Sequence, residues 1–124
     1  MLNLYTLLSG IIEPIATCYA GHFPTSEKKV YPYVSIKFPN SLPNNSFSDT
    51  NLLEVDIWDD KDTDINEIEG ITDLIHKELN RLQINNEIFN ISINRNNPYR
   101  LELADEMIGI QRRELRYTVK VYYK

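Results

Sequence analysis

Cysteine is nearly absent from this chain of 124 residues. The single cysteine, Cys18, rules out a disulfide framework within the chain and fits a reducing cytoplasm. The four glycines are scattered singly, so the sequence has no glycine-rich loop of the kind that cradles a phosphate group. No apolar run is long enough to span a membrane.

The apolar start of the chain lacks the features of a secretory signal. Residues 1–21 contain no lysine or arginine, and Glu13 and Pro14 interrupt the apolar run. The segment 15–18 is a weak lipoprotein cleavage box, because Thr17 stands where a smaller residue is preferred. We therefore expect a protein that is neither secreted nor lipidated.

Basic residues are fewer than acidic ones, 13 against 18, which gives a formal net charge of −5. This balance argues against a nucleic-acid-binding protein, whose affinity comes mostly from neutralising phosphates. The hydrophobic share of 42% and the charged share of 25% are ordinary for a soluble globular protein. The length predicts a single domain that spans residues 1–124.

The clearest pattern is a strand followed by a helix in the middle of the chain. Apolar and acidic residues alternate over 53–57, which predicts a half-buried strand within 51–59. Apolar residues then recur every three or four positions from Ile65 to Leu82, which predicts an amphipathic helix with Leu74 on its apolar side. Asp64 and Glu67 are expected to cap the start of that helix.

The remaining elements are shorter. We expect a short helix over 2–8 that stops at Gly10, because glycine favours helix ends. Strands are predicted at 15–19, 30–38, 88–93, 99–103 and 110–123, the second to last only weakly. Residues 39–50 and 94–109 have the composition of long polar loops, and Phe47 in the first is either a contact residue or tucked onto the sheet.

This order of elements predicts an α+β fold. We expect two layers: a mainly antiparallel sheet of four to five strands, with one long helix and a short N-terminal helix packed on one face. The other face would be aromatic and mixed in charge, and alternation assigns to it Tyr31, Tyr33, Lys37, Glu54, Asp56, Trp58, Arg116, Lys120 and Tyr122. Tyrosine, tryptophan and arginine are enriched at binding hot spots. Tyrosines are also common in β-sheets without any role in binding, so both interpretations stay open.

The acidic turn 59–64 is the one cluster that resembles a metal site. Asp60, Asp62 and Asp64 have the spacing of an EF-hand loop, but Ile65 and Ile71 replace the glycine and the glutamate that this loop needs. We therefore expect a solvated turn and predict no metal, no cofactor and no enzymatic activity. The alternatives are a divalent-metal-binding module or small enzyme that uses this turn, and an unrelated cytoplasmic adaptor.

Four segments together resemble a known family. They are Pro32-Tyr-Val-Ser-Ile36, Leu53-Glu-Val-Asp-Ile-Trp58, the helix from Ile65 to Leu82, and the arginine- and tyrosine-rich strand from Arg112 to Tyr123. Their order and spacing are similar to those of the tail-completion, or tail-terminator, proteins of long-tailed bacteriophages and prophages, also described as tail-to-head joining proteins. The resemblance covers residues 30–124.

The resemblance implies a structural virion protein. Members of the family form a ring, typically a hexamer, that caps the tail tube and meets the head connector. DNA passes through the ring without sequence-specific binding, and no membrane is involved. Such a protein assembles in the bacterial host cytoplasm and resides in the virion tail. By this analogy we hypothesise that subunit or tail-tube contacts involve Phe47, Trp58, Arg95, Tyr99, Arg112, Arg113, Arg116 and Tyr122.

Overall fold

The computed structural model describes residues 2–20, 31–39, 41–45, 48–61, 64–104 and 109–123. The described helices are α1 (Leu2–Ile12) and α2 (Asn66–Leu79). The described strands are β1 (Thr17–Ala20), β2 (Tyr33–Lys37), β3 (Ser41–Asn45), β4 (Ser48–Asp59), β5 (Gln83–Asn85), β6 (Phe89–Ala104) and β7 (Gln111–Tyr123). Phe47 lies outside the described residues.

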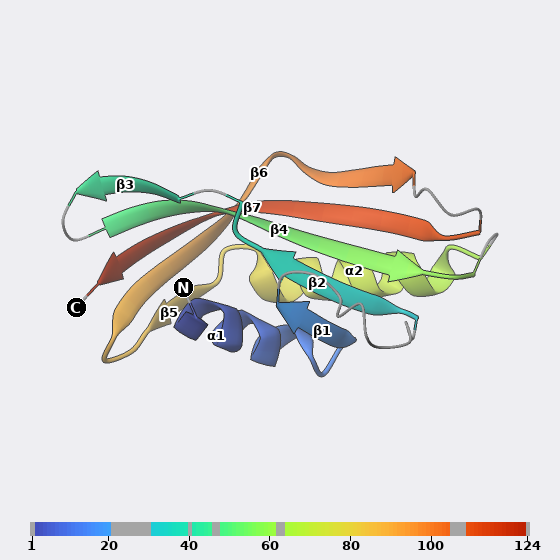
Figure 1. Cartoon of the computed structure of the whole chain (residues 1–124), viewed down its shortest axis with the longest axis horizontal. Coiled ribbons are helices and arrows are strands. Elements are labelled where there is room, and N and C mark those ends of the chain that lie inside the picture. Colours follow the sequence, from blue (N-terminus) through green and yellow to red (C-terminus); the bar gives the residue numbers. More distant parts are fainter. Residues whose placement is uncertain are drawn as a thin grey trace.

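The strands form one mixed sheet of seven strands in the order β1-β2-β4-β7-β6-β5, with β3 paired to β4. The β1–β2 pair is parallel and the other pairs are antiparallel. The long central strands β4 and β7 pair along their length, from Ser48 opposite Tyr122 to Asp59 opposite Gln111. Both helices lie along one side of this sheet (Figure 1).

The predicted fold class is wrong about the sheet. Seven strands replace the expected four to five, one edge pair is parallel, and the two helices have 11 and 14 residues rather than one being long and one short. The extra strands come from segments with loop-like composition. The long neighbouring strands β4 and β7 offer backbone partners to these segments, and pairing then outweighs local propensity.

Helix α1 buries one stripe of its surface. Leu4, Leu8 and Ile12, spaced four residues apart, join the core. The predicted stop at Gly10 is wrong, because the helix continues for two residues and buries Ile12 completely. Burying such a side chain contributes about 2 kcal/mol, which exceeds the roughly 1 kcal/mol cost of a glycine in a helix.

Helix α2 is confirmed, with shorter bounds than predicted. Its buried residues are Ile68, Ile71, Thr72, Ile75 and Leu79. Leu74, expected on the apolar side, is instead 52% exposed. At the start of the helix, the Asn66 backbone N–H donates to Asp64 Oδ1 at 2.9 Å, whereas Glu67 forms an ion pair with Lys61 in place of the expected capping contact. Neither described helix has the length and apolarity needed to cross a bilayer.

The predicted loop over 94–109 is wrong for its first part, because β6 continues to Ala104. The turn-like residues 96–99 are accommodated in a bulge: Arg95 lies opposite Tyr117 and Arg100 opposite Leu115. A proline is tolerated at a bulge because no ladder hydrogen bond is lost there. The strand bends sharply in its middle, as Figure 1 shows.

The predicted loop over 39–50 is also wrong where the structure describes it. Residues 41–45 form β3, which pairs with the first part of β4, and Ser41 lies opposite Asn51. Among the described residues β3 pairs with β4 alone, so Pro43 can lie in it without costing a central ladder hydrogen bond.

Candidate functional site

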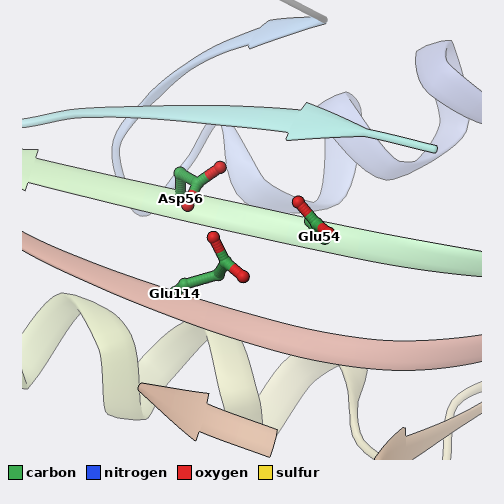
Figure 2. A group of neighbouring side chains, drawn as sticks. All are labelled: Glu54, Asp56 and Glu114. Carbon is green, nitrogen blue, oxygen red and sulfur yellow. The ribbon is translucent and has the colours of Figure 1, made fainter. Parts of the chain in front are cut away.

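The face of the sheet opposite the two described helices, which we call the helix-free face, carries a group of three carboxylates. Glu54 and Asp56 point from β4 and Glu114 points from β7, as Figure 2 shows. Asp56 and Glu114 lie directly opposite each other in the β4–β7 register, so their side chains share this face. One carboxylate oxygen from each of the three residues lies within 4.8 Å of the others. We call this group the carboxylate cluster.

Three basic side chains neutralise the carboxylate cluster. Lys37 Nζ lies 3.5 Å from Glu54 Oε2 and 3.6 Å from Asp56 Oδ2. Arg112 Nη2 lies 3.0 Å from Asp56 Oδ1 and 3.5 Å from Glu114 Oε2, and Arg116 Nε donates to Glu114 Oε1 at 2.6 Å.

Two of the three carboxylates are buried although neither described helix covers this face. Asp56 is 0% exposed and Glu114 is 3% exposed. Burial raises the pKa of Asp56 to about 6, and the hydrogen bond and negative charge of Glu114 add to the rise. Burial opposes ionisation of Glu114 too, but hydrogen bonds from Asp56 and Arg116 outweigh it and lower the pKa of Glu114. The pair therefore holds a proton on Asp56 in mildly acidic solution.

Three carboxylates from neighbouring strands have the hard oxygen donors that a divalent cation prefers. The positive charges of Lys37, Arg112 and Arg116 already balance them, and an added ion would have to displace Lys37 from between Glu54 and Asp56. We therefore interpret the carboxylate cluster as the core of an ion-pair network.

Aromatic rings adjoin this network. Trp58 stacks on Tyr33 with ring centroids 4.9 Å apart and an interplanar angle of 15°. The Arg112 guanidinium lies 5.1 Å from the centroid of the Trp58 ring. Tyr33 also contacts Tyr31 and Tyr19, at centroid distances of 5.3 and 6.1 Å. Arg112 thus connects the aromatic rings to the carboxylate cluster. We call Trp58, Tyr33, Arg112 and Arg116 the outer-face cluster.

The alternation of side chains along the strands correctly predicted which residues lie on this face. The register places Tyr33, Lys37, Glu54, Asp56, Trp58 and Arg116 on the same side of the sheet, as predicted. Strand alternation does not say which strands are neighbours, and only the β4–β7 pairing brings Glu114 against Asp56. The burial of these two acids was the part that sequence reasoning missed.

The predicted contact residues do not form one surface. Trp58, Arg112 and Arg116 belong to the outer-face cluster. Tyr122 lies on the same face, 43% exposed, but roughly 30 Å from Arg112 along β7. Arg95 lies opposite Tyr117, on the side of the sheet that the helices cover.

Arg113 was predicted to be a contact residue, but its side chain is buried on the helix side of β7. It is 4% exposed, and its Nε donates to Glu69 Oε1 of α2 at 2.7 Å. Glu69 also pairs with Arg100, whose other branch reaches Asp73 Oδ1 at 2.6 Å. Arg113 therefore joins α2 to the sheet. Arg113 is two residues from Leu115 on the same strand, so alternation alone would have assigned its side chain to the buried face.

Tyr99, another predicted contact, is half-buried against the helix layer. Its ring stacks on His76 at a centroid distance of 4.5 Å, and His76 Nδ1 lies 2.7 Å from the Tyr117 hydroxyl. Burial and the charges of Arg95 and Arg100 lower the pKa of His76. Tyr99 thus lies against a partly buried polar contact between α2 and the sheet.

Two carboxylates of the acidic turn, Asp59 and Asp64, accept hydrogen bonds from the local backbone. Asp59 is buried, and its Oδ1 accepts a hydrogen bond from the Asp60 N–H at 2.8 Å. Asp64 Oδ1 accepts from Asn66, and Gln111 Nε2 donates to the Asp64 carbonyl at 3.2 Å. Among the described residues, the carboxylates that converge are those of the carboxylate cluster, not those of the turn.

Comparison with models of known protein families found no match, and comparison with curated proteins found no match either.

Proposed function

We propose that this chain is a structural subunit that assembles into a ring, caps a phage tail tube and joins the tail to the head connector. The observation that carries the proposal is the outer-face cluster, which lies on the sheet face opposite the two described helices. The resemblance of the strand and helix segments to tail-completion proteins supplies the identity of the partners. A ring of six subunits is the form that this resemblance implies.

The outer-face cluster suits a contact surface because its parts are already held in place. Trp58 lies against Tyr33 and beneath Arg112, and Asp56 and Glu114 bind the guanidinium of Arg112. Side chains that are ordered before binding lose less conformational entropy when a partner arrives. Tryptophan, tyrosine and arginine are also the residues that most often dominate binding energy.

A closed ring needs two unlike surfaces on each subunit. The outer-face cluster is one, and the exposed side of α2, with Leu74 at 52% exposure, lies in the opposite layer. Neighbouring subunits would therefore meet head to tail. Arg95 and Tyr99 lie on the helix side of the sheet, so they serve a partner other than the one that contacts Trp58.

The proposed protein has no catalytic role and needs no cofactor. It would assemble in the bacterial host cytoplasm and remain in the virion tail, where DNA passes without sequence-specific binding. The net charge of −5 suits this passage, because an acidic lumen repels DNA.

The test is tail assembly in host cells whose phage lacks this gene. We expect tails of uncontrolled length that fail to join heads, and we expect added protein to cap the tubes in electron micrographs. Tails of normal length, joined to heads in the absence of the protein, would refute the proposal.

A pair of truncations then tests the surface. Trp58→Ala should fold but fail to cap tubes, whereas Ile88→Ala, which also shortens an exposed apolar side chain, should cap them normally. Urea unfolding of both variants separates loss of binding from loss of folding. Equal capping by the two variants would show that the outer-face cluster is not the contact surface.

A further inference from the structure

Four of the six arginines in this chain pair with carboxylates. These are Arg100, Arg112, Arg113 and Arg116. Within the described residues, no carboxylate oxygen lies within 4.0 Å of the other two, Arg81 and Arg95. With 18 acidic residues against 13 basic ones, we would expect each arginine to have a carboxylate partner, so these two are exceptions.

The two unpaired arginines line the same hollow. Asn80, Arg81, Asn94 and Arg95 form its lining, and its volume is about 350 Å³. It lies where the end of α2 meets β6, next to the β6 residues that pair with β5. The two arginines carry guanidinium N–H donors, and no acidic residue is among the four lining residues.

The backbone at the end of α2 holds Arg81 in an uncommon conformation. Its φ is +65°, a left-handed value that usually belongs to glycine or asparagine at this position after a helix. Hydrogen bonds on both sides fix the turn: Asn80 N–H donates to the His76 carbonyl at 2.9 Å, and Ile93 N–H donates to the Leu82 carbonyl at 2.9 Å. The turn therefore presents an arginine where glycine would be less strained.

Arg95 is also held in place. Its guanidinium carbon lies 5.0 Å from the centroid of the Tyr99 ring, and that ring stacks on His76. This contact leaves the N–H donors of Arg95 without an anionic partner. Two guanidiniums that line one hollow repel each other, and a shared anion would relieve this repulsion.

We propose that this hollow binds a phosphate group through Arg81 and Arg95, with the amide of Asn80 as a further donor. Arginine N–H groups match the geometry of phosphate oxygens and can bind them in pairs. The source is either free phosphate or the phosphodiester backbone of a nucleic acid. Contacts to phosphate oxygens carry no sequence information, so binding to a nucleic acid would not depend on sequence. The proposal concerns the single chain and does not rest on the proposed function.

Calorimetric titration at low salt tests the site with two probes, inorganic phosphate and a short DNA duplex. The variants are Arg81→Gly, which suits the positive φ, and Arg95→Gln. The control is Lys120→Gln, which also removes one positive charge but lies on the helix-free face of β7. Urea unfolding checks that every variant remains folded.

We expect each arginine variant to weaken binding about tenfold, as loss of a charge-assisted hydrogen bond does. Arg95→Gln should also reduce the slope of log affinity against log salt for DNA by about one, whereas Lys120→Gln should leave the affinity nearly unchanged. Binding of inorganic phosphate identifies a free phosphate site, and binding of DNA alone identifies the backbone as ligand. Absence of binding to both probes, or an equal loss in the Lys120→Gln control, would overturn the proposal.

Discussion

Replacing Asp56 with asparagine tests whether the buried carboxyl pair holds a proton. Asp56 is fully buried opposite Glu114, and its pKa rises from the ordinary 3.8 to about 6. Between these values the folded protein binds more protons than the unfolded chain, so the free energy of unfolding falls as pH rises. This contribution is fully present below about pH 4 and is lost once the pH has passed about 6.

The size of the effect follows from the pKa. Each unit of pKa difference corresponds to about 1.4 kcal/mol. Asp56 is protonated in the folded protein but ionised in the unfolded chain between about pH 4 and about pH 6. Raising the pH from about 5 to about 7 crosses the last pH unit of this range, from about 5 to about 6. The wild-type protein should therefore lose about 1.4 kcal/mol of unfolding free energy from this group. Asparagine cannot titrate, but its amide can donate to Glu114 as the protonated acid does. The Asp56→Asn variant should therefore lack this loss.

Urea unfolding followed by the fluorescence of Trp58, the one tryptophan, measures this difference. The lowered pKa of His76 acts in the opposite direction: its contribution is present above the ordinary histidine pKa and is lost as the pH falls. Wild type and variant share His76, so the difference between their profiles isolates Asp56. Asp60→Asn, which removes an exposed carboxylate, is the control and should parallel the wild type. If the unfolding free energies of wild type and Asp56→Asn changed with pH in the same way, Asp56 would not hold a proton in the folded protein.

Three further substitutions test single contacts by urea unfolding, followed by circular dichroism because Trp58→Ala removes the one tryptophan. Trp58→Ala should lower the unfolding free energy by about 2 kcal/mol through loss of its ring stack and cation–π contact, while a collapse of the fold would contradict its placement on the helix-free face. Arg113→Ala should cost about 3 kcal/mol, because it removes a buried guanidinium from Glu69; a change below about 0.5 kcal/mol would show that this pair does not join helix to sheet. Tyr117→Phe should cost about 1 kcal/mol through loss of the 2.7 Å contact with His76, and an unchanged stability would mean that solvent replaces the hydroxyl.

Strongly periodic segments were predictable because their pattern reports burial directly. The alternation in β4 and β7 and the helical period of α2 each identify a face that must leave water. The helix-free face and its aromatic residues followed from the same alternation. Trp58 and Arg116 could therefore be assigned to the same face of the sheet from the sequence alone.

Segments with turn-like residues were not predictable in this way. Asn94–Pro98 has the composition of a turn, yet it lies in a bulge of β6 because β7 offers partners on both sides of it. Residues 41–45 likewise become a strand because β4 lies beside them. Arg113 was misassigned for a related reason: its charge indicated the surface, but Glu69 of α2 makes its burial possible.

The sequence by itself determined which residues alternate along each strand and which stripe of each helix is apolar, because these patterns arise from backbone geometry alone. The tertiary structure decided which strands are neighbours. That decision brings Asp56 against Glu114, supplies Lys37 from β2 and Arg112 from β7, and places Arg81 and Arg95 around one hollow. The energies of charged groups depend on distance and burial, which are fixed only when segments far apart in the chain meet.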